Sequence, residues 1–138
     1  ATDMLAEAKL TPELRNEALY FRAKAYLNQQ ADKKAMNDLQ ALAKDTRTLY
    51  GAEAKYLVAL QLYKAHEYAA AEKEILNFIE QSTPHAYWLA RSFILLSDVY
   101  VSMDKKLDAR QYLLSLQQNY HADDDIEQMI NERLEKLK

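Results

Sequence analysis

The residues of this chain best suited to chemistry are its three histidines and its clusters of carboxylates. His66, His85 and His121 lie in expected turns or at an expected helix start, and none pairs with another at the i, i+4 spacing of a helical metal site. A zinc site needs ligands that converge from one side of the fold, and this spacing supplies none. We therefore expect solvated histidines, no bound metal and no cofactor.

The clustered acidic residues fit structural roles better than catalytic ones. Asp123–Asp125 lacks the alternating oxygen ligands and central glycine of a calcium loop, so we expect it to cap the helix that follows. Asp124 and Glu127 have capping-box spacing there. Glu72 and Glu74 flank a lysine, which is typical of a solvated helix face rather than of paired catalytic acids.

Asp98 is the most informative single carboxylate. It follows the apolar run Phe93–Leu96 in an otherwise apolar stretch. Its role stays open between contact with a ligand and a structural one, either a salt bridge to Arg91 or Lys64 or simple solvation.

The composition predicts helices and disfavours most enzyme classes. Of 138 residues, 49% are hydrophobic and 28% are charged, which are the proportions of one soluble globular domain. One glycine and two prolines are too few for the tight turns of a sandwich, a barrel or a doubly wound sheet. Glycine-dependent phosphate and dinucleotide motifs cannot be formed, and the absence of cysteine excludes disulfides and thiolate catalysis. We expect a protein that is not an enzyme, with an unusual helical enzyme as a remote alternative.

Charge and hydropathy narrow the possible partners. The net charge of −3 disfavours a general electrostatic attraction to nucleic acid. The longest apolar stretches are far shorter than the roughly 20 residues of a membrane helix, so we expect no membrane insertion. The chain begins at Ala1, which suggests a C-terminal fragment of a longer protein.

The apolar pattern predicts paired helices along a single domain. Thr11 and Pro12 begin the first, and Thr83-Pro84 repeats this start later. The expected helices span residues 12–27, 32–45, 52–65, 68–81, 85–103, 107–119 and 124–138. Residues 1–10 are expected to be the remnant of an earlier helix, residues 11–46, 49–81 and 83–120 to form three units, and residues 124–138 to cap the array.

The three units repeat one pattern of small and large residues. Ala35, Ala71 and Ala109 lie 36 and 38 residues apart, and apolar residues recur at fixed distances from each. The matching positions are Ala23, Tyr26, Ala35, Leu39 and Leu42; Ala59, Leu62, Tyr68, Ala71, Ile75 and Phe78; and Ser97, Tyr100, Ala109, Leu113 and Leu116.

This pattern resembles the tetratricopeptide repeat (TPR), a unit of two helices and about 34 residues. The resemblance implies a right-handed α-solenoid of antiparallel helix pairs that binds a protein or peptide. The family's glycine after its first helix is replaced here by Gln30, His66 and Asp104. The general character of the sequence is also similar to that of repeat proteins of the bacterial cell envelope, especially those of Bacteroidota. That resemblance favours the periplasm or cell envelope over the cytoplasm and suggests a scaffold in an envelope assembly.

In the TPR family the first helix of each unit lines a concave groove. Carried over by position, the binding groove would contain Tyr20, Lys24, Tyr56, Leu60, Tyr63, Lys64, Arg91 and Asp98, with Glu17, Leu27, Asn28, Glu53, Ile94, Val101 and Ser102 beside them. Members that bind a C-terminal carboxylate hold it with basic residues at set positions of the groove. Only Lys24 is basic at those positions here, and Asp98 would repel the ligand, so we expect a different one.

The aromatic residues divide into packing and binding candidates. The groove register points Tyr20, Tyr56 and Tyr63 outward, where either ligand binding or exposed packing is open. We expect core packing for Tyr26, Tyr68, Tyr100 and Tyr112, and packing at a repeat junction for Trp88 with Tyr87. An alternative function is homo-oligomerisation through an uncapped N-terminal face.

Overall fold

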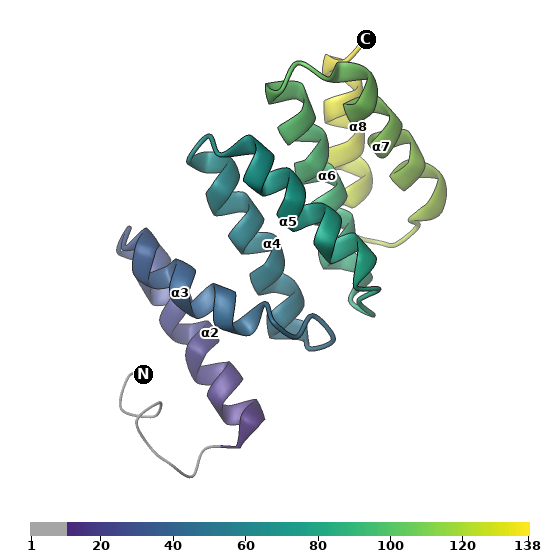
Figure 1. Cartoon of the computed structure of the whole chain (residues 1–138). Coiled ribbons are helices and arrows are strands. Elements are labelled where there is room, and N and C mark those ends of the chain that lie inside the picture. Colours follow the sequence, from purple (N-terminus) through teal and green to yellow (C-terminus); the bar gives the residue numbers. More distant parts are fainter. Residues whose placement is uncertain (1–10) are drawn as a thin grey trace.

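The computed structural model describes residues 11–138, so the predicted helix remnant over residues 1–10 lies outside the described residues. The described part is all-helical, as the composition predicted, and has no strand. Its helices, labelled in Figure 1, are α2 (Pro12–Asn28), α3 (Asp32–Leu42), α4 (Leu49–Lys64), α5 (Tyr68–Glu80), α6 (Ala86–Ser102), α7 (Lys106–Asn119) and α8 (Ile126–Lys136).

Local hydrogen bonds explain where the first helices begin. Helix α2 starts as predicted, because the Thr11 hydroxyl accepts a hydrogen bond from the Leu14 amide at 3.2 Å. Helix α4 starts at Leu49, three residues earlier than the predicted 52. There Thr48 is the N-cap, and its hydroxyl accepts from the Gly51 amide at 2.9 Å. Because glycine is a weak helix former, the sequence pattern did not predict a first turn that contains Gly51.

Two other predicted boundaries are corrected. Thr83 does not cap α6; its hydroxyl accepts from the His85 amide and donates to the Thr46 carbonyl. The α8 helix begins at Ile126, and its N-cap Asp125 makes no capping hydrogen bond from its side chain. The expected capping box does not form, and Asp124 instead accepts from the Ile126 amide at 3.0 Å.

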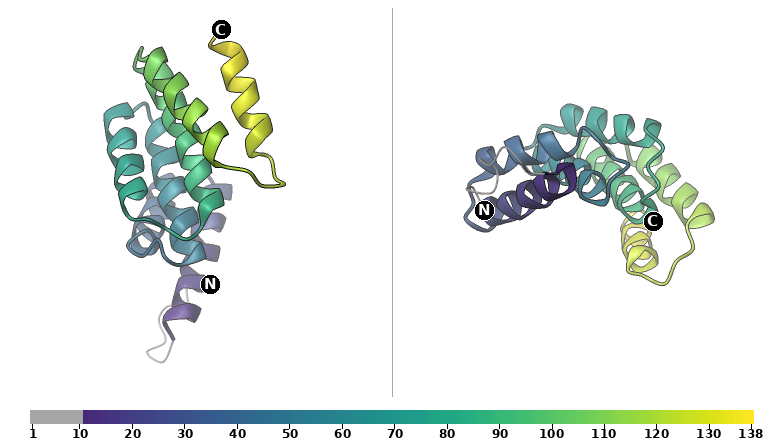
Figure 2. Two further views of the ribbon diagram at one scale, coloured as in Figure 1. Left: turned by 90° about the vertical axis from the view of Figure 1, so that its right-hand side faces the viewer. Right: turned by 90° about the horizontal axis from the view of Figure 1, so that it is seen from below.

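The helices pack as consecutive pairs, α2–α3, α4–α5 and α6–α7, followed by α8. Helices α2, α4, α6 and α8 contact one another in succession, whereas no contact joins α3, α5 and α7 among themselves in the described chain. The α4, α6 and α8 helices each contact both helices of the pair before them, whereas α3, α5 and α7 stay apart from one another, so the row of α2, α4, α6 and α8 is the more closely spaced one. Figure 2 shows the resulting arc, with α2 and α8 on its inner side and α3, α5 and α7 on its outer side.

Burial follows the repeated pattern read from the sequence. Three hydrophobic clusters follow one another along the array, one between α2 and α4, one around α4 to α7, and one between α6 and α8. The repeated small residues are all at most 1% exposed: Ala23, Ala59, Ser97, Ala35, Ala71 and Ala109. Small side chains at these crossings let the helix backbones approach closely, and the larger residues fill the space around them.

The turns inside the three helix pairs share one unusual backbone conformation. Gln30, His66 and Asp104 have φ values of 59°, 64° and 59°, the left-handed region that glycine adopts most easily. These are the three positions at which the sequence pattern departs from the glycine of the TPR family. Each such residue reverses the chain after the first helix of its pair.

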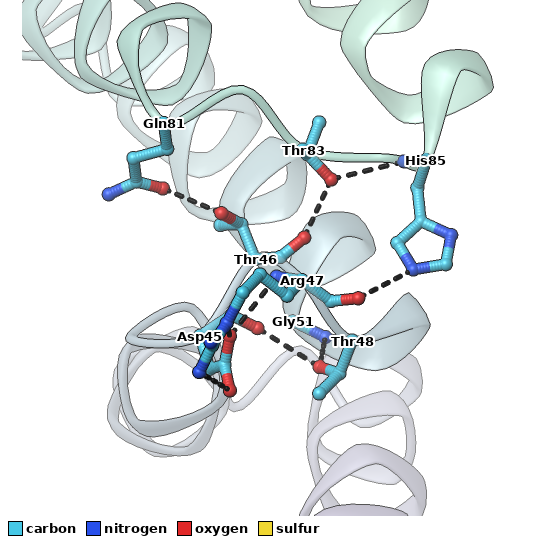
Figure 3. Close-up of polar contacts among 8 residues, drawn as sticks. All are labelled: Asp45, Thr46, Arg47, Thr48, Gly51, Gln81, Thr83 and His85. Atoms are coloured by element: carbon cyan, nitrogen blue, oxygen red, sulfur yellow. Dashed lines mark hydrogen bonds and ion pairs between the residues drawn. The ribbon is translucent and has the colours of Figure 1, made fainter.

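The loops that join the pairs are tied to each other. The Thr46 hydroxyl donates to Gln81 Oε1 at 2.8 Å, and the Thr83 hydroxyl donates to the Thr46 carbonyl at 2.6 Å (Figure 3). His85 Nε2 lies 2.9 Å from the Arg47 carbonyl oxygen. These contacts fix the α3–α4 loop against the α5–α6 loop.

The chain's single glycine allows this arrangement. A Cβ on Gly51 would lie 1.9 Å from the Asp45 carbonyl oxygen, so the first turn of α4 could not sit against this loop with any other residue.

Within residues 11–138, no helix combines the length and the apolar character needed to cross a membrane.

Candidate functional site

A depression lies where α4, α6 and α8 meet, and we call it the α8 pocket. It is an open cavity of about 520 Å³. Its lining residues are Tyr63, Ser97, Asp98, Val101, Ser102, Lys106, Glu132, Arg133, Lys136 and Leu137. Most of these residues come from α4, α6 and α8, which contact one another in succession.

A two-point ion pair builds one wall of the pocket. Arg133 donates through Nε to Asp98 Oδ1 at 2.9 Å and through Nη2 to Asp98 Oδ2 at 3.0 Å. Its Nη1 donates to the Met129 carbonyl at 3.3 Å, which fixes the guanidinium on its own helix. Planar two-point pairing restricts orientation, so it sets the position of α8 against α6.

The pocket is lined by several groups that can donate hydrogen bonds. The Ser97 hydroxyl is buried and unpartnered on a residue that is 1% exposed. Tyr63 and Ser102 add hydroxyls, and Lys106 and Lys136 add ammonium groups. Val101, which is 39% exposed, contributes apolar surface beside them.

Farther along the inner side, an aromatic and polar contact joins α2 to α4. The Tyr20 ring lies 4.5 Å from the Tyr50 ring, and its hydroxyl donates to Glu53 at 3.2 Å. Lys24 pairs with the same carboxylate at 3.1 Å. Burial and the Glu53 charge raise the pKa of Tyr20. Burial opposes the charged form of Lys24, but its hydrogen bond to Glu53 and the charge of that carboxylate outweigh burial and raise its pKa.

The same arrangement recurs one unit later between α4 and α6. Tyr56 occupies the place of Tyr20, and its ring lies 5.6 Å from Trp88, which replaces Tyr50. Arg91 replaces Glu53 and donates to the Tyr56 hydroxyl at 3.1 Å. Its guanidinium also lies 5.1 Å from the Tyr56 ring centroid, a cation–π distance. The predicted junction packing of Trp88 is confirmed by these contacts.

Several expected groove residues therefore serve packing instead. Tyr56 is 6% exposed, Glu53 is 8% exposed and Ile94 is 1% exposed, so the expectation that they face a groove was wrong. The physical reason is that neighbouring helices on the inner side touch, and the touching faces are buried. Arg91, another expected groove residue, is part-buried. Its guanidinium donates to the Tyr87 and Tyr56 hydroxyls and has no carboxylate partner among the described residues.

The remaining predicted groove residues lie at three different places in the structure. Tyr63 and Asp98 line the α8 pocket together. Leu60 and Lys64 instead line a second depression, of about 470 Å³, between the ends of α2 and α4. Tyr20 and Lys24 belong to the α2–α4 junction. Asp98 does form a structural salt bridge, but its partner is Arg133 rather than the expected Arg91 or Lys64.

The sequence pattern missed the residues that close the pocket. Lys106, Glu132, Arg133, Lys136 and Leu137 come from the start of α7 and from α8. The sequence predicts only a capping role for residues 124–138, which assigns no function to the polar side chains of that helix. Its polar residues at positions 132, 133 and 136 were the available signal, because they recur at helical spacing on one side.

Two expectations about chemistry are also corrected. His85 is not simply solvated, since it is half-buried against the Arg47 carbonyl. Glu74 pairs with Lys55 at 2.7 Å, and that lysine is only 7% exposed. Across the described residues, no three His, Asp or Glu side chains gather closely enough to hold a metal ion.

The arrangement thus presents a rigid inner surface with one donor-rich pocket. Comparison with known proteins adds no family to this description, because no family model, curated protein or solved structure matches the chain.

Proposed function

We propose that this chain is a non-catalytic scaffold that binds a segment of a partner protein on its inner face. The observation that carries the proposal is the α8 pocket, which combines the Tyr63 ring and Val101 with hydroxyl and ammonium groups that can donate hydrogen bonds. Apolar contact area beside a few directional polar groups is what recognition of a peptide requires.

The proposed architecture is a right-handed α-solenoid of TPR-like units. Three features support it: the consecutive helix pairs, the inner contacts among α2, α4, α6 and α8, and the left-handed residues at the family's glycine positions. The recurrence of one junction design, from Tyr20 with Glu53 to Tyr56 with Arg91, also favours repeated units.

The proposed mechanism is preorganisation. The ion pair between Asp98 and Arg133 and the aromatic contacts of Tyr56 hold the inner helices in place before any partner arrives. A receptor that is already ordered loses little conformational entropy on binding, so more of the contact energy appears as affinity.

The test is selection from a library of short random peptides on the immobilised protein. We expect binders that are lost when Val101→Trp fills the α8 pocket. The matched control is Leu107→Trp, because Leu107 is 80% exposed and does not line the pocket. Circular dichroism and thermal unfolding verify that both variants keep the wild-type fold.

Peptides that the wild type and Leu107→Trp hold, and that Val101→Trp releases, would support the proposal. Failure to select any peptide, or selection of peptides that bind all three proteins equally, would contradict it. In the latter case the binding surface would lie elsewhere on the array.

A second candidate function is self-association through α2, favoured by a specific exposed face. Leu14 is 44% exposed and Phe21 is 55% exposed. Their counterparts one unit later, Tyr50 and Leu57, pack against the preceding helix pair, and Leu95 in the next unit is 3% exposed. The exposed face of α2 that contains Leu14 and Phe21 thus corresponds to faces of α4 and α6 that pack against the helix pairs before them.

This alternative makes a separate prediction. Sedimentation velocity of the wild type should show a concentration-dependent dimer that Phe21→Glu abolishes and Val101→Trp leaves intact. A monomer at every concentration would remove this candidate function without affecting the first.

A further inference from the structure

We propose that the α8 pocket selects an acidic segment, with a partner carboxylate received between Lys106 and Lys136. The inference rests on the proposed function and adds the chemistry of the partner. It concerns α7 and α8, which the groove register of the sequence did not include.

The first argument is the balance of charge. Asp98 is already neutralised by its two-point pair with Arg133. Among the other charged lining residues, Lys106 and Lys136 face a single carboxylate, Glu132, which accepts a hydrogen bond from Gln128 at 3.1 Å. A local excess of positive charge in a chain of net charge −3 favours a ligand of the opposite sign.

The second argument is the excess of donors. Ser97 lines the pocket and is 1% exposed, and its buried hydroxyl has no hydrogen-bond partner among the described residues. The Tyr63 and Ser102 hydroxyls and the two ammonium groups line the same pocket and can donate hydrogen bonds to a ligand. A carboxylate carries acceptors only, so it complements this set better than an amide or a cation does.

The third argument is the apolar part of the lining. Val101 and Leu137 lie in the same pocket as the charged groups, with the Tyr63 ring beside them. An isolated small anion would leave this surface in water. A peptide that places an aliphatic side chain next to its acidic residue would cover it and would gain from the burial.

From the sequence, two features disfavour a C-terminal carboxylate ligand: Lys24 is the only basic residue at the family's binding positions, and Asp98 would repel the ligand. In the structure that repulsion is offset, because Arg133 donates to both oxygens of Asp98, and the basic residues of the α8 pocket come from α7 and α8. Among the other charged lining residues, the two lysines outnumber the single carboxylate of Glu132. An acidic ligand therefore meets no uncompensated charge from α6.

The experiment uses the peptides selected on the wild-type protein. We expect Asp and Glu to be enriched in them beside aliphatic residues. Affinity, measured by fluorescence polarisation, should fall as salt rises and should weaken by about fivefold or more in Lys106→Gln/Lys136→Gln. The matched control is Lys33→Gln/Lys44→Gln, which removes the same charge from exposed positions outside the pocket lining and should leave affinity within about twofold.

Each other outcome has a definite meaning. Neutral or basic peptides that depend on Val101 but not on the two lysines would overturn the acidic preference and leave the proposed function standing. Equal losses in the two lysine variants would overturn the placement of the carboxylate. If glutarate alone binds as tightly as the peptides, the site is one for small acids and the inference of a peptide partner is wrong. If no peptide depends on the pocket, the proposed function fails together with this inference.

Discussion

Individual residues show how this chain forms its turns and close helix contacts with a single glycine. Its single glycine, Gly51, is placed where the Asp45 carbonyl leaves no room for a side chain. The three turns that favour glycine for its backbone freedom instead contain Gln30, His66 and Asp104, at φ of about 60°. At Gly51, lack of space predicts that replacing glycine destabilises the fold. At the three turn positions, backbone strain predicts that introducing glycine stabilises it.

Replacing Gly51 by alanine should destabilise the fold. Alanine normally stabilises a helix relative to glycine, but here its Cβ would lie 1.9 Å from the Asp45 carbonyl oxygen. We expect a loss of about 1–3 kcal/mol in the free energy of unfolding, measured by urea titration. The control is Ala70→Gly, an exposed helical site that should show the ordinary glycine cost of about 1 kcal/mol. A more stable Gly51→Ala protein would refute the steric argument.

Placing glycine at Gln30 should have the opposite effect. The backbone there has φ of 59°, so glycine removes the strain of a side chain in the left-handed region. We expect a gain of about 0.5–1 kcal/mol in stability, measured in the same way. Lys33→Gly, in an exposed part of α3, should instead lose about 1 kcal/mol. Equal losses at both sites would show that the turn carries no such strain.

Among the helices, those on the inner side carry most of the specific contacts. Tyr20 and Tyr56 link successive inner helices through rings and hydroxyls, and Asp98 with Arg133 does so for the last pair. Helices α3, α5 and α7 do not touch one another. The position of α8, and with it one wall of the α8 pocket, should therefore depend strongly on one ion pair.

A double-mutant cycle tests that dependence. Asp98→Ala and Arg133→Ala should show a coupling of about 1 kcal/mol, because both side chains are only 26% exposed and bind at two points. Hydrogen exchange in α8 should rise in either single variant. The exposed pair Glu135 and Lys138 is the control and should show no measurable coupling. Additive effects at Asp98 and Arg133 would mean that apolar packing alone positions α8.

At the scale of the whole molecule, the helix pairs within residues 11–138 contact only their neighbours along the chain. Stability in such an array is shared through the junctions, so a central element is held from two sides and a terminal element from one. Helices α4, α5 and α6 share the cluster that contains Tyr56, Leu96 and Tyr100. Helix α2 and helix α8 each adjoin a single cluster.

We therefore expect a gradient of amide protection along the chain. Hydrogen exchange followed by mass spectrometry should show the slowest exchange in α4 to α6 and faster exchange in α2 and α8. Phe78→Ala, at a residue that is 1% exposed, should raise exchange most strongly in α4 and α5. Uniform protection along the described chain would indicate one cooperative unit rather than an array.

The sequence by itself determined the helices, their pairing and the register of their small residues. The reason is that helix periodicity and the burial of residues such as Ala71 and Ala109 are local properties that recur along the chain. It also indicated that Tyr63 and Asp98 would share a surface, since both lie at related positions of successive inner helices.

Only the tertiary structure decided which side of each inner helix is free. Tyr56 and Ile94 have the same repeat position as the half-buried Tyr20, yet both are buried by neighbouring helices. The partner of Asp98 comes from a helix 35 residues away, which no local pattern specifies. Contacts between distant helices depend on how the whole array curves, so the α8 pocket exists only once α4, α6 and α8 are packed together.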